Sequence, residues 1–217
     1  MIFINKKKHK SKLIWLKNHF SDYYVKKVHN NFNKFRSRSW FKLEELHNID
    51  YLFKKGMNVI DFGSSPGGWS SFASLQIGET GKIIANDILS MEKIYNVDFI
   101  QGNLLDINIY NKLEQKFKKQ KTQIIMSDMA PNMTGIKTID IPKSIYLNLI
   151  VLNLCKNYLV YNGSIVMKIF QSNEFQSLYH KICKMFDNVR IRKPNSSKTR
   201  SCEIYIVAKG YKKYNFV

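Results

Sequence analysis

Cysteine and proline are scarce in this chain of 217 residues, which has three of the first and four of the second. The cysteines, Cys155, Cys183 and Cys202, lie far apart, are odd in number and form no C-x-x-C pair. This spacing disfavours a disulfide framework or a zinc site and is typical of a reducing compartment. No apolar run reaches the length of a membrane span, so we expect no membrane partner.

The amino terminus also lacks the order of a secretory signal, because its lysines follow the short apolar patch. We therefore expect a protein that is not secreted and that works in the cytoplasm or in an organelle matrix such as that of the mitochondrion. The sequence leaves open whether the first residues form a short organellar targeting segment.

Acidic residues are few: 16 Asp and Glu face 35 Lys and Arg, which gives a net charge of +19. Residues 1–42 hold twelve of the cations against one acid, Asp22. So strong an excess predicts a polyanionic partner, because cations neutralise phosphates and flat rings can stack on bases. A solvated lysine-rich face is the plain alternative. The aromatic residues interleaved with these cations are Trp15, Phe20, Tyr23, Tyr24, Phe32, Phe35, Trp40 and Phe41.

Two familiar glycine motifs are absent, namely G-x-G-x-x-G and G-x-x-x-x-G-K-[ST]. Their absence disfavours a dinucleotide-binding enzyme and a phosphate-loop nucleotidase. A different turn, Asp61-Phe-Gly-Ser-Ser-Pro-Gly-Gly-Trp69, follows an apolar stretch that reads as a buried strand. Glycines there would let a ligand approach the backbone. Because the turn has no lysine for phosphates, it suggests a nucleoside-like cofactor without a pyrophosphate, such as S-adenosylmethionine; a turn that serves only the fold is the alternative.

Strands and helices alternate along the rest of the chain. Near-continuous apolar strands in such an alternation predict a parallel sheet covered by helices on both faces, and the last two strands predict an antiparallel hairpin at its edge. We expect helices near Arg38–His47, Trp69–Gln76, Tyr110–Lys119, Pro142–Tyr161 and Glu174–Phe186. Asn162-Gly163 is expected to stop the fourth helix. We expect strands at Met57–Phe62, Lys82–Asp87, Val97–Gln101, Gln123–Asp128, Ser164–Phe170, Val189–Lys193 and Cys202–Lys209.

Charged residues inside apolar strands indicate a site. Lys168 interrupts Ile165–Phe170, and a buried lysine is costly unless it is paired or functional. Asp128 ends another strand, where a carboxylate would lie beside the cofactor cleft. Asp87 lies about twenty residues beyond the glycine turn, the position from which an acid commonly holds ribose hydroxyls. Asn103 could reach the adenine edge. The alternatives are a structural ion pair for Lys168 and ordinary turn roles for the others.

Several segments together resemble the FtsJ/RrmJ-type ribosomal RNA 2′-O-methyltransferases, the bacterial heat-shock type and its mitochondrial relatives. The likeness covers the chain from about Ser11 to Gly210. The segments that carry it are Arg36-Ser-Arg-Ser-Trp-Phe-Lys42, Asp61–Trp69, Ser127-Asp-Met-Ala-Pro-Asn132, Asp140-Ile-Pro142, Val166-Met-Lys-Ile-Phe-Gln171 and Arg200-Ser-Cys-Glu-Ile-Tyr205.

This resemblance implies a Rossmann-like S-adenosylmethionine-dependent methyltransferase fold with a seven-stranded sheet. It also implies a catalytic set made of Lys42, Asp128, Lys168 and Glu203, with no metal. The family usually has Asp where this chain has Asn103, and small apolar residues where it has Ser64-Ser65. The cofactor-binding residues that it implies are Gly63, Pro66, Gly67, Gly68, Trp69, Asp87, Ile88, Asn103, Leu104 and Asp128.

The implied reaction is 2′-O-ribose methylation of a nucleotide, uridine being the expected one, in large-subunit ribosomal RNA. Lys168 would take or steer the hydroxyl proton. The implied partner is ribosomal RNA or the large ribosomal subunit, and we expect a monomer. Residues 1–35 would be a basic RNA-contacting extension, and residues 36–217 one methyltransferase domain. A tRNA 2′-O-methyltransferase and a non-catalytic RNA-binding ribosome-assembly factor are the alternatives.

Overall fold

The computed structural model describes residues 23–31, 35–118, 122–198 and 201–212. In this part of the chain, the strands are β1 Asn58–Phe62, β2 Lys82–Asp87, β3 Val97–Gln101, β4 Thr122–Ser127, β5 Leu159–Phe170, β6 Phe186–Arg192 and β7 Glu203–Tyr211. The helices are α2 Tyr23–Asn30, α4 Ser39–Asp50, α5 Gly68–Ile77, α6 Ile107–Phe117, α7 Lys137–Tyr158 and α8 Phe175–Met185.

The strands form one seven-stranded sheet in the order β3-β2-β1-β4-β5-β7-β6. The pairs among β1 to β5 are parallel, whereas β7 runs antiparallel between β5 and β6. The chain order reverses between β1 and β4, and ligands bind at such switch points in open α/β sheets. The predicted sheet, with its antiparallel edge pair, is confirmed.

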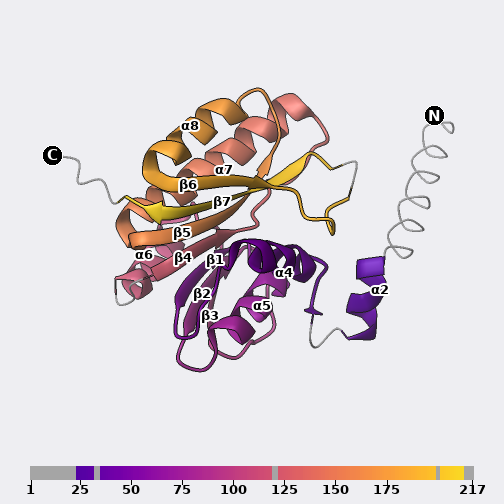
Figure 1. Ribbon diagram of the computed structural model, residues 1–217, viewed down its shortest axis with the longest axis vertical. Helices are drawn as coiled ribbons and strands as arrows, with labels where there is room; N and C mark the ends of the chain where they lie inside the picture. Colours follow the sequence, from indigo (N-terminus) through magenta and orange to yellow (C-terminus); the bar gives the residue numbers. More distant parts are fainter. Residues whose placement is uncertain (1–22, 32–34, 119–121, 199–200, 213–217) are drawn as a thin grey trace.

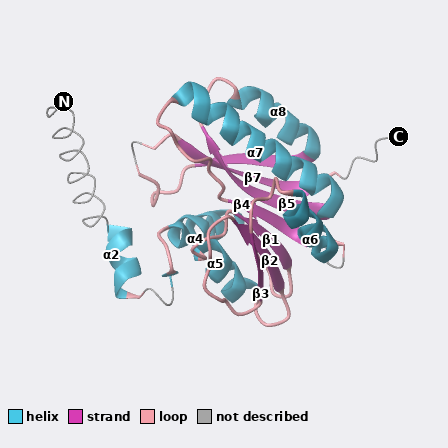
Figure 2. Ribbon diagram, turned by 180° about the vertical axis from the view of Figure 1, so that it is seen from behind, coloured by secondary structure: helices cyan, strands magenta, loops and turns pink. Residues whose placement is uncertain are grey.

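Helices cover both faces of the sheet, as the apolar strands predict (Figure 1). Residues of α6, α7 and α8 build one core cluster with Ile60, Ile125 and Ile165. Residues of α4 and α5 build the other with Val59, Ile124 and Tyr205. Figure 2 shows α7 and α8 side by side over their face. Since alternate strand residues point to opposite faces, the strands can feed both clusters at once.

Helix α7 begins five residues before the predicted start at Pro142, which lies inside it. The extra turn is tied down by Asp140, whose carboxylate accepts hydrogen bonds from the backbone nitrogens of Thr134 and Gly135, each 2.9 Å long. A proline is therefore no reliable helix start here, because Pro142 is accommodated inside the helix and the first residues are held by the bonds of Asp140 to the segment before it.

The prediction that Asn162-Gly163 ends this helix is wrong. Helix α7 already ends at Tyr158, and Leu159 is extended and pairs with Thr122. Strand β5 therefore runs from Leu159, and its register against β4 shifts between Thr122 and Ile124. Asn162 has a φ of 62° at this irregularity. Asn162-Gly163 therefore shapes a bend within a strand. The same pair of residue types is also common where helices end.

Three described aromatic residues of the basic segment, Phe35, Trp40 and Phe41, pack into the core, so the expectation that they stack on bases is wrong for them, whereas Tyr23 is exposed. Phe35, Trp40 and Phe41 are 7%, 3% and 3% exposed. They belong to the cluster beneath α4 and α5, because the apolar side of α4 faces the sheet. Helix α2, which the sequence analysis did not predict, packs Val28 on the same cluster. Trp15, Phe20 and Phe32 lie outside the described residues.

None of the helices that the structure describes has both the length and the apolar character that crossing a membrane requires.

Candidate active site

Asp128 and Lys168 meet at the carboxyl ends of β4 and β5. The Nζ atom of Lys168 lies 3.0 Å from Oδ1 of Asp128 and donates a 2.5 Å hydrogen bond to the backbone oxygen of the same residue. Their side chains are 10% and 17% exposed. The backbone nitrogen of Asp128 donates to the carbonyl oxygen of Phe62, the last residue of β1. This ion pair therefore lies directly beside the glycine turn.

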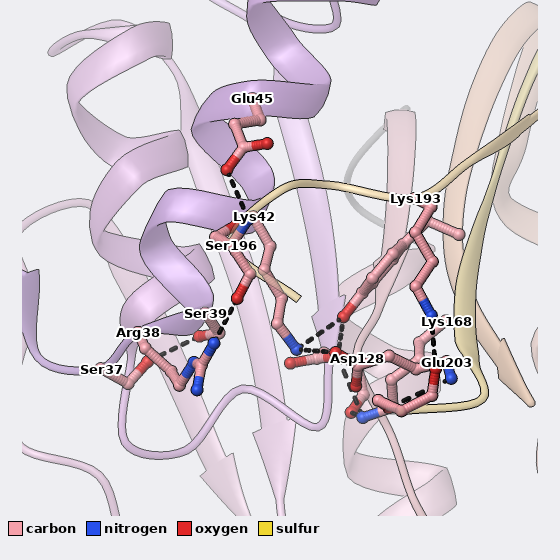
Figure 3. A network of polar contacts seen from close by, with 12 residues as sticks. Ser37, Arg38, Ser39, Lys42, Glu45, Asp128, Lys168, Lys193, Ser196 and Glu203 are labelled. Atoms are coloured by element: carbon pink, nitrogen blue, oxygen red, sulfur yellow. Dashed lines mark hydrogen bonds and ion pairs between the residues drawn. The ribbon is translucent and has the colours of Figure 1, made fainter. Parts of the chain in front are cut away.

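A second ion pair joins helix α4 to strand β7. Nζ of Lys42 lies 2.6 Å from Oε1 of Glu203, and the two side chains are 10% and 14% exposed. Figure 3 shows Lys42 reaching from α4 toward Glu203, with Asp128 and Lys168 next to this pair. The structure thus brings together the four charged residues that the sequence singled out.

Tyr205 joins the two pairs, and the sequence analysis missed it. Its hydroxyl accepts a 3.1 Å hydrogen bond from Nζ of Lys42 and donates a 3.4 Å bond to Oδ1 of Asp128. Tyr205 stands directly opposite Lys168 in the β5–β7 ladder. In sequence it reads as one more apolar strand residue, because nothing in Ile204–Ala208 marks its hydroxyl as part of a polar network.

Burial and charge shape the ionisation of this group. Burial raises the pKa of the Tyr205 phenol well above its ordinary value, and the carboxylates of Asp128 and Glu203 raise it further. The phenol therefore stays protonated and can donate. Burial alone would raise the pKa of Glu203. The nearby ammonium group of Lys42 outweighs burial, so the pKa of Glu203 is lowered. Glu203 is thus held as a carboxylate.

Helix α4 also fixes the segment between β6 and β7. The Glu45 carboxylate accepts hydrogen bonds from the backbone nitrogens of Asn195 and Ser196, at 2.6 and 2.9 Å. The guanidinium group of Arg38 donates to the backbone oxygen of Ser196 (Figure 3). The helix that carries Lys42 therefore holds the loop that leads into Glu203.

The glycines of the turn serve close packing of the chain on itself. Gly63 has a φ of +75°, and a Cβ there would lie 2.7 Å from the backbone nitrogen of Met129. Gly67, with a φ of +109°, makes room for Arg36, whose guanidinium group donates to the backbone oxygens of Glu92 and Lys93. At these two positions the positive φ and the nearby protein atoms already require glycine, and contact of their backbone with a ligand stays a prediction.

Trp69 is buried, with 2% of its surface exposed. Its indole nitrogen donates a 3.0 Å bond to the backbone oxygen of Ser39, and its ring lies 5.8 Å from that of Tyr205. The side chain thus packs between α4 and Tyr205.

The other residues expected at the cofactor stand at the ends of β2 and β3. Asp87 accepts hydrogen bonds from the backbone nitrogens of Ser65 and Leu89, both 2.9 Å long, so it links the glycine turn to the loop after β2. Asn103 closes its own turn by accepting from the nitrogen of Leu105. Pro66 and Ile88 are exposed, Gly68 is buried at the start of α5, and Leu104 lies in the core.

Asp61 is a buried acid that the sequence analysis did not assign to the site. Its Oδ2 accepts a 2.6 Å bond from the Ser70 hydroxyl at the start of α5. Burial raises the pKa of Asp61 to about 7, despite this hydrogen bond. Within the described part of the chain, Oδ1 of Asp61 and Oγ of Ser64 are buried without a hydrogen-bond partner. Polar atoms in this state suit a polar ligand at the turn.

Comparison with known proteins identifies the family. A protein-family model described as FtsJ-like methyltransferase matches residues 35–211. The chain belongs to the FtsJ-like methyltransferase family. A solved structure from Plasmodium falciparum, described as a ribosomal RNA methyltransferase, is 31% identical over 81% of this chain and 98% of its own, with a TM-score of 0.71. The FtsJ-like fold and the resemblance seen in the sequence are therefore confirmed.

Two further structures share the fold alone. A protein from Lactococcus lactis described as a hemolysin is 17% identical, covering 83% of this chain and 90% of its own, with a TM-score of 0.58. Aeropyrum pernix fibrillarin, solved with natively bound S-adenosyl-L-methionine, is 16% identical, covering 81% and 76%, with a TM-score of 0.53.

S-adenosylmethionine is the cofactor of this FtsJ-like methyltransferase. The residues at the switch point fit it. The Asp87 carboxylate suits ribose hydroxyls, the Asn103 amide suits the adenine edge, and the unpartnered oxygens of Asp61 and Ser64 suit the polar methionyl part.

Proposed function

We propose that this methyltransferase transfers a methyl group from S-adenosylmethionine to the ribose 2′-oxygen of a nucleotide, with uridine as the expected one, in large-subunit ribosomal RNA. The observation that carries the proposal is the joined group of Lys42, Glu203, Tyr205, Asp128 and Lys168 beside the glycine turn. Two lysines, two carboxylates and a phenol can orient a hydroxyl. The similarity to the Plasmodium ribosomal RNA methyltransferase supports RNA as the substrate.

The proposed cofactor contacts divide along the sheet edge. Asp87 holds the ribose, Asn103 and the neighbouring Ile88 and Leu104 hold the adenine, and the turn from Gly63 to Trp69 holds the methionyl part, with Asp128 closing the cleft. The cofactor supplies an electrophilic methyl group on a positively charged sulfur. Everything else that the reaction needs is alignment and activation of a weakly acidic hydroxyl.

Lys168 is the residue that we assign to the hydroxyl. An ammonium group has three N–H donors, and the two oxygens of Asp128 account for two of them. The third donor can hold the 2′-oxygen and stabilise the negative charge that develops as its proton leaves. That proton passes to water or to a carboxylate oxygen of Asp128. With S-adenosylmethionine bound, the cofactor would supply the methyl for a C–O bond to the ribose 2′-oxygen as its C–S bond breaks, with a neutral thioether as the leaving group.

Lys42, Glu203 and Tyr205 act as positioning residues in this scheme. The ion pair of Lys42 with Glu203 fixes the phenol, and the phenol donates to the same Oδ1 atom of Asp128 that binds Lys168. Their arrangement therefore determines the direction in which Lys168 presents its free N–H group.

RNA would bind through the basic part of the chain. We propose residues 1–35 as an RNA-contacting extension of a single methyltransferase domain at 36–217, with phosphate contacts that do not read sequence. Within the described residues, Lys26 on α2 is exposed and available for such a contact. The described aromatic rings of this segment are packed inward, apart from the exposed Tyr23, so charge carries this part of the proposal.

We propose a monomer in the cytoplasm or an organelle matrix. The three free cysteines fit a reducing compartment. Methylation of tRNA would use the same chemistry with another acceptor. A non-catalytic assembly factor is disfavoured, because it would have no need for two buried lysines in paired contacts.

The decisive experiment measures transfer of labelled methyl groups from S-adenosylmethionine to undermethylated large ribosomal subunits, with total tRNA alongside. A 2′-O-methyl group protects the next phosphodiester from alkali, so label in an alkali-resistant dinucleotide identifies the ribose oxygen. Label in large-subunit RNA that disappears in Lys168→Ala supports the proposal. Label in tRNA would contradict the proposed substrate, and label on a base would contradict transfer to the ribose oxygen.

A further inference from the structure

A cavity of about 330 Å³ lies near the catalytic group, at the ends of β5 and β7, which are separated by β4 from the strand before the glycine turn. Four segments line it: the loop after β4, the first turns of α7, the end of β5 and the residues before β7. This volume is at the small end of the range of ligand pockets, about 300–1,000 Å³. The lining residues are Met133, Gly135, Lys137, Asp140, Ile141, Phe170, Gln171, Ser201 and Cys202.

The strand register places this cavity next to the reacting atoms. Phe170 pairs with Glu203 in the β5–β7 ladder, and Lys168 pairs with Tyr205 two residues away. Directly opposed residues share a face, and so do residues two apart along a strand. The cavity therefore begins one side chain beyond Lys168 and Glu203. Across the sheet, Asp128 separates it from the cofactor turn on β1.

The walls of the cavity combine an apolar surface, which includes one flat ring, with a polar edge. Met133, Ile141 and Phe170 contribute the apolar surface. Gln171 adds an amide, which offers both a donor and an acceptor, and Lys137 adds a positive charge. A flat ring with hydrogen-bonding groups at its edge and an attached phosphate matches this combination. Splayed-out RNA bases are recognised in this way, by stacking on side chains and by contacts at their edges.

The loop wall is fixed in place before any ligand arrives. The Asp140 carboxylate accepts three hydrogen bonds of 2.9 Å, from the backbone nitrogens of Thr134 and Gly135 and from the Thr134 hydroxyl. These bonds, chiefly the one from the Thr134 backbone, lower the pKa of Asp140, which stays a carboxylate at neutral pH. Asp140 is itself 3% exposed. A wall fixed in this way holds its shape for a rigid ligand.

We propose that this cavity binds the base of the acceptor nucleotide, so that its ribose lies over Lys168. The inference rests on the proposed function, because it assigns the base that belongs to the methylated ribose. Phe170 and Met133 contact the faces of the ring, Gln171 contacts its edge, and Lys137 contacts a flanking phosphate. The cofactor and the acceptor base then lie on opposite sides of the catalytic group, which leaves the acceptor ribose between them, where its 2′-oxygen can face the methyl carbon.

Methionine methyl groups provide a test that does not depend on methyl transfer. Met133 lines the proposed base cavity, whereas Met185 lines a separate groove between α7 and α8. With ¹³C in the methionine methyl groups, NMR spectra are followed as each of the four nucleoside 5′-monophosphates is added. We expect the Met133 signal, assigned through Met133→Leu, to shift with at least one nucleotide while the Met185 signal stays in place.

Two controls make this result decisive. Ribose 5-phosphate, which has no base, should leave the Met133 signal unmoved, and Phe170→Ala should abolish the nucleotide-induced shift. Gln171→Ala, at an exposed position, should weaken it if Phe170→Ala disturbs folding. The proposal is overturned if no nucleotide shifts Met133, or if ribose 5-phosphate shifts it equally. Because no methyl group is transferred, these outcomes are distinct from failure of the proposed function.

A kinetic cycle on the RNA substrate then separates base recognition from structural damage. Phe170→Ala should lower kcat/KM about tenfold on RNA with an intact acceptor base, the size expected for one lost stacking contact. On the same RNA with an abasic acceptor ribose, the variant and wild type should agree within about twofold. Met185→Ala should change neither value. An equal loss from Phe170→Ala on both RNAs would show that the ring only supports the fold.

Discussion

The ammonium group of Lys42 lies 3.1 Å from the hydroxyl of Tyr205 and 5.6 Å from the centre of its ring. The two residues are 163 positions apart in the chain, and this contact connects the Lys42–Glu203 pair to the Asp128–Lys168 pair. The candidate site is therefore one network that spans α4, β4, β5 and β7. A change at its edge should reach Lys168 through the phenol.

Tyr205→Phe tests this connection, since it removes the hydroxyl and keeps the ring that packs on Trp69. We expect kcat to fall about two- to tenfold, the effect of one hydrogen bond, while the dissociation constant of S-adenosylmethionine stays within about twofold. Tyr211→Phe, on the same strand, is the control and should leave kcat unchanged. A kcat equal to that of wild type in Tyr205→Phe would show that the two ion pairs work independently.

Lys168→Ala should lower methyl transfer by about 10² to 10⁴-fold, because no other described cation donates to Asp128 Oδ1 in its place. Cofactor affinity, measured by calorimetry, should stay within about threefold. Lys168→Arg should also be impaired, because its planar donors cannot make the same two contacts with Asp128. Lys82→Ala, exposed at the start of β2, controls for loss of a positive charge. Undiminished turnover in Lys168→Ala would contradict its assignment.

Glu45→Ala should loosen the loop before β7, because two backbone nitrogens lose their acceptor. Amide hydrogen exchange of the peptide that contains Asn195 and Ser196 should become at least about tenfold faster. The KM for RNA should rise, with cofactor affinity unchanged. Glu44→Ala removes a neighbouring carboxylate and is the matched control. Equal exchange in wild type and Glu45→Ala would show that the other contacts of this loop, among them those of Arg38 and Lys193, are sufficient to hold it.

Asp61 predicts a definite pH dependence of stability. Its pKa in the folded state is about 7, above its ordinary value of 3.8, so the folded protein keeps a proton that the unfolded chain releases. The free energy of unfolding should therefore fall as pH rises from 3.8 to about 7, by on the order of 1 kcal/mol per unit, and level off above. Asp61→Asn should lose this slope. Urea unfolding at pH 5 and pH 8 measures the difference, and equal slopes in both proteins would contradict it.

RNA affinity should fall steeply with salt concentration if the basic residues of segment 1–35 bind phosphates. The logarithm of the association constant should decrease linearly with the logarithm of salt concentration. Lys26→Ala should make the slope shallower by about 0.7 to 0.9, the contribution of one neutralised phosphate. Lys184→Ala, on helix α8 across the sheet, is the control. A salt response that is flat in wild type would contradict electrostatic binding of RNA.

The sequence predicted the parts of the site whose residues conflict with their surroundings. Lys168 stands out because a charged side chain interrupts an apolar strand, and Asp128 because an acid ends one. Tyr205 gives no such signal, since a tyrosine inside an apolar strand is ordinary, and its hydroxyl becomes meaningful only once β7 lies beside β5. The sequence gives no sign of the role of Asp61 for the same reason, because its contact with Ser70 forms only when α5 packs against β1.

The wrong predictions have a different cause: the same residue type is found in several kinds of local structure. Phe35, Trp40 and Phe41 could stack on bases or fill a core, and only the packing of α4 on the sheet decides between these roles. Asn162-Gly163 has the same ambiguity between a helix end and a bend in a strand. Local patterns thus predicted the order of the elements well and their junctions poorly.

Arg36 and Arg38, two positions apart, hold different halves of the molecule. Arg36 binds the backbone of the loop after β2, and Arg38 binds the backbone of the loop before β7. One short segment thus connects the loop after β2, on the proposed cofactor side, with the loop before β7, on the proposed acceptor side. Thermodynamic linkage then makes the two ligands interdependent: if the cofactor tightens one loop and so changes RNA affinity, RNA must change cofactor affinity by the same factor, whichever of them binds first.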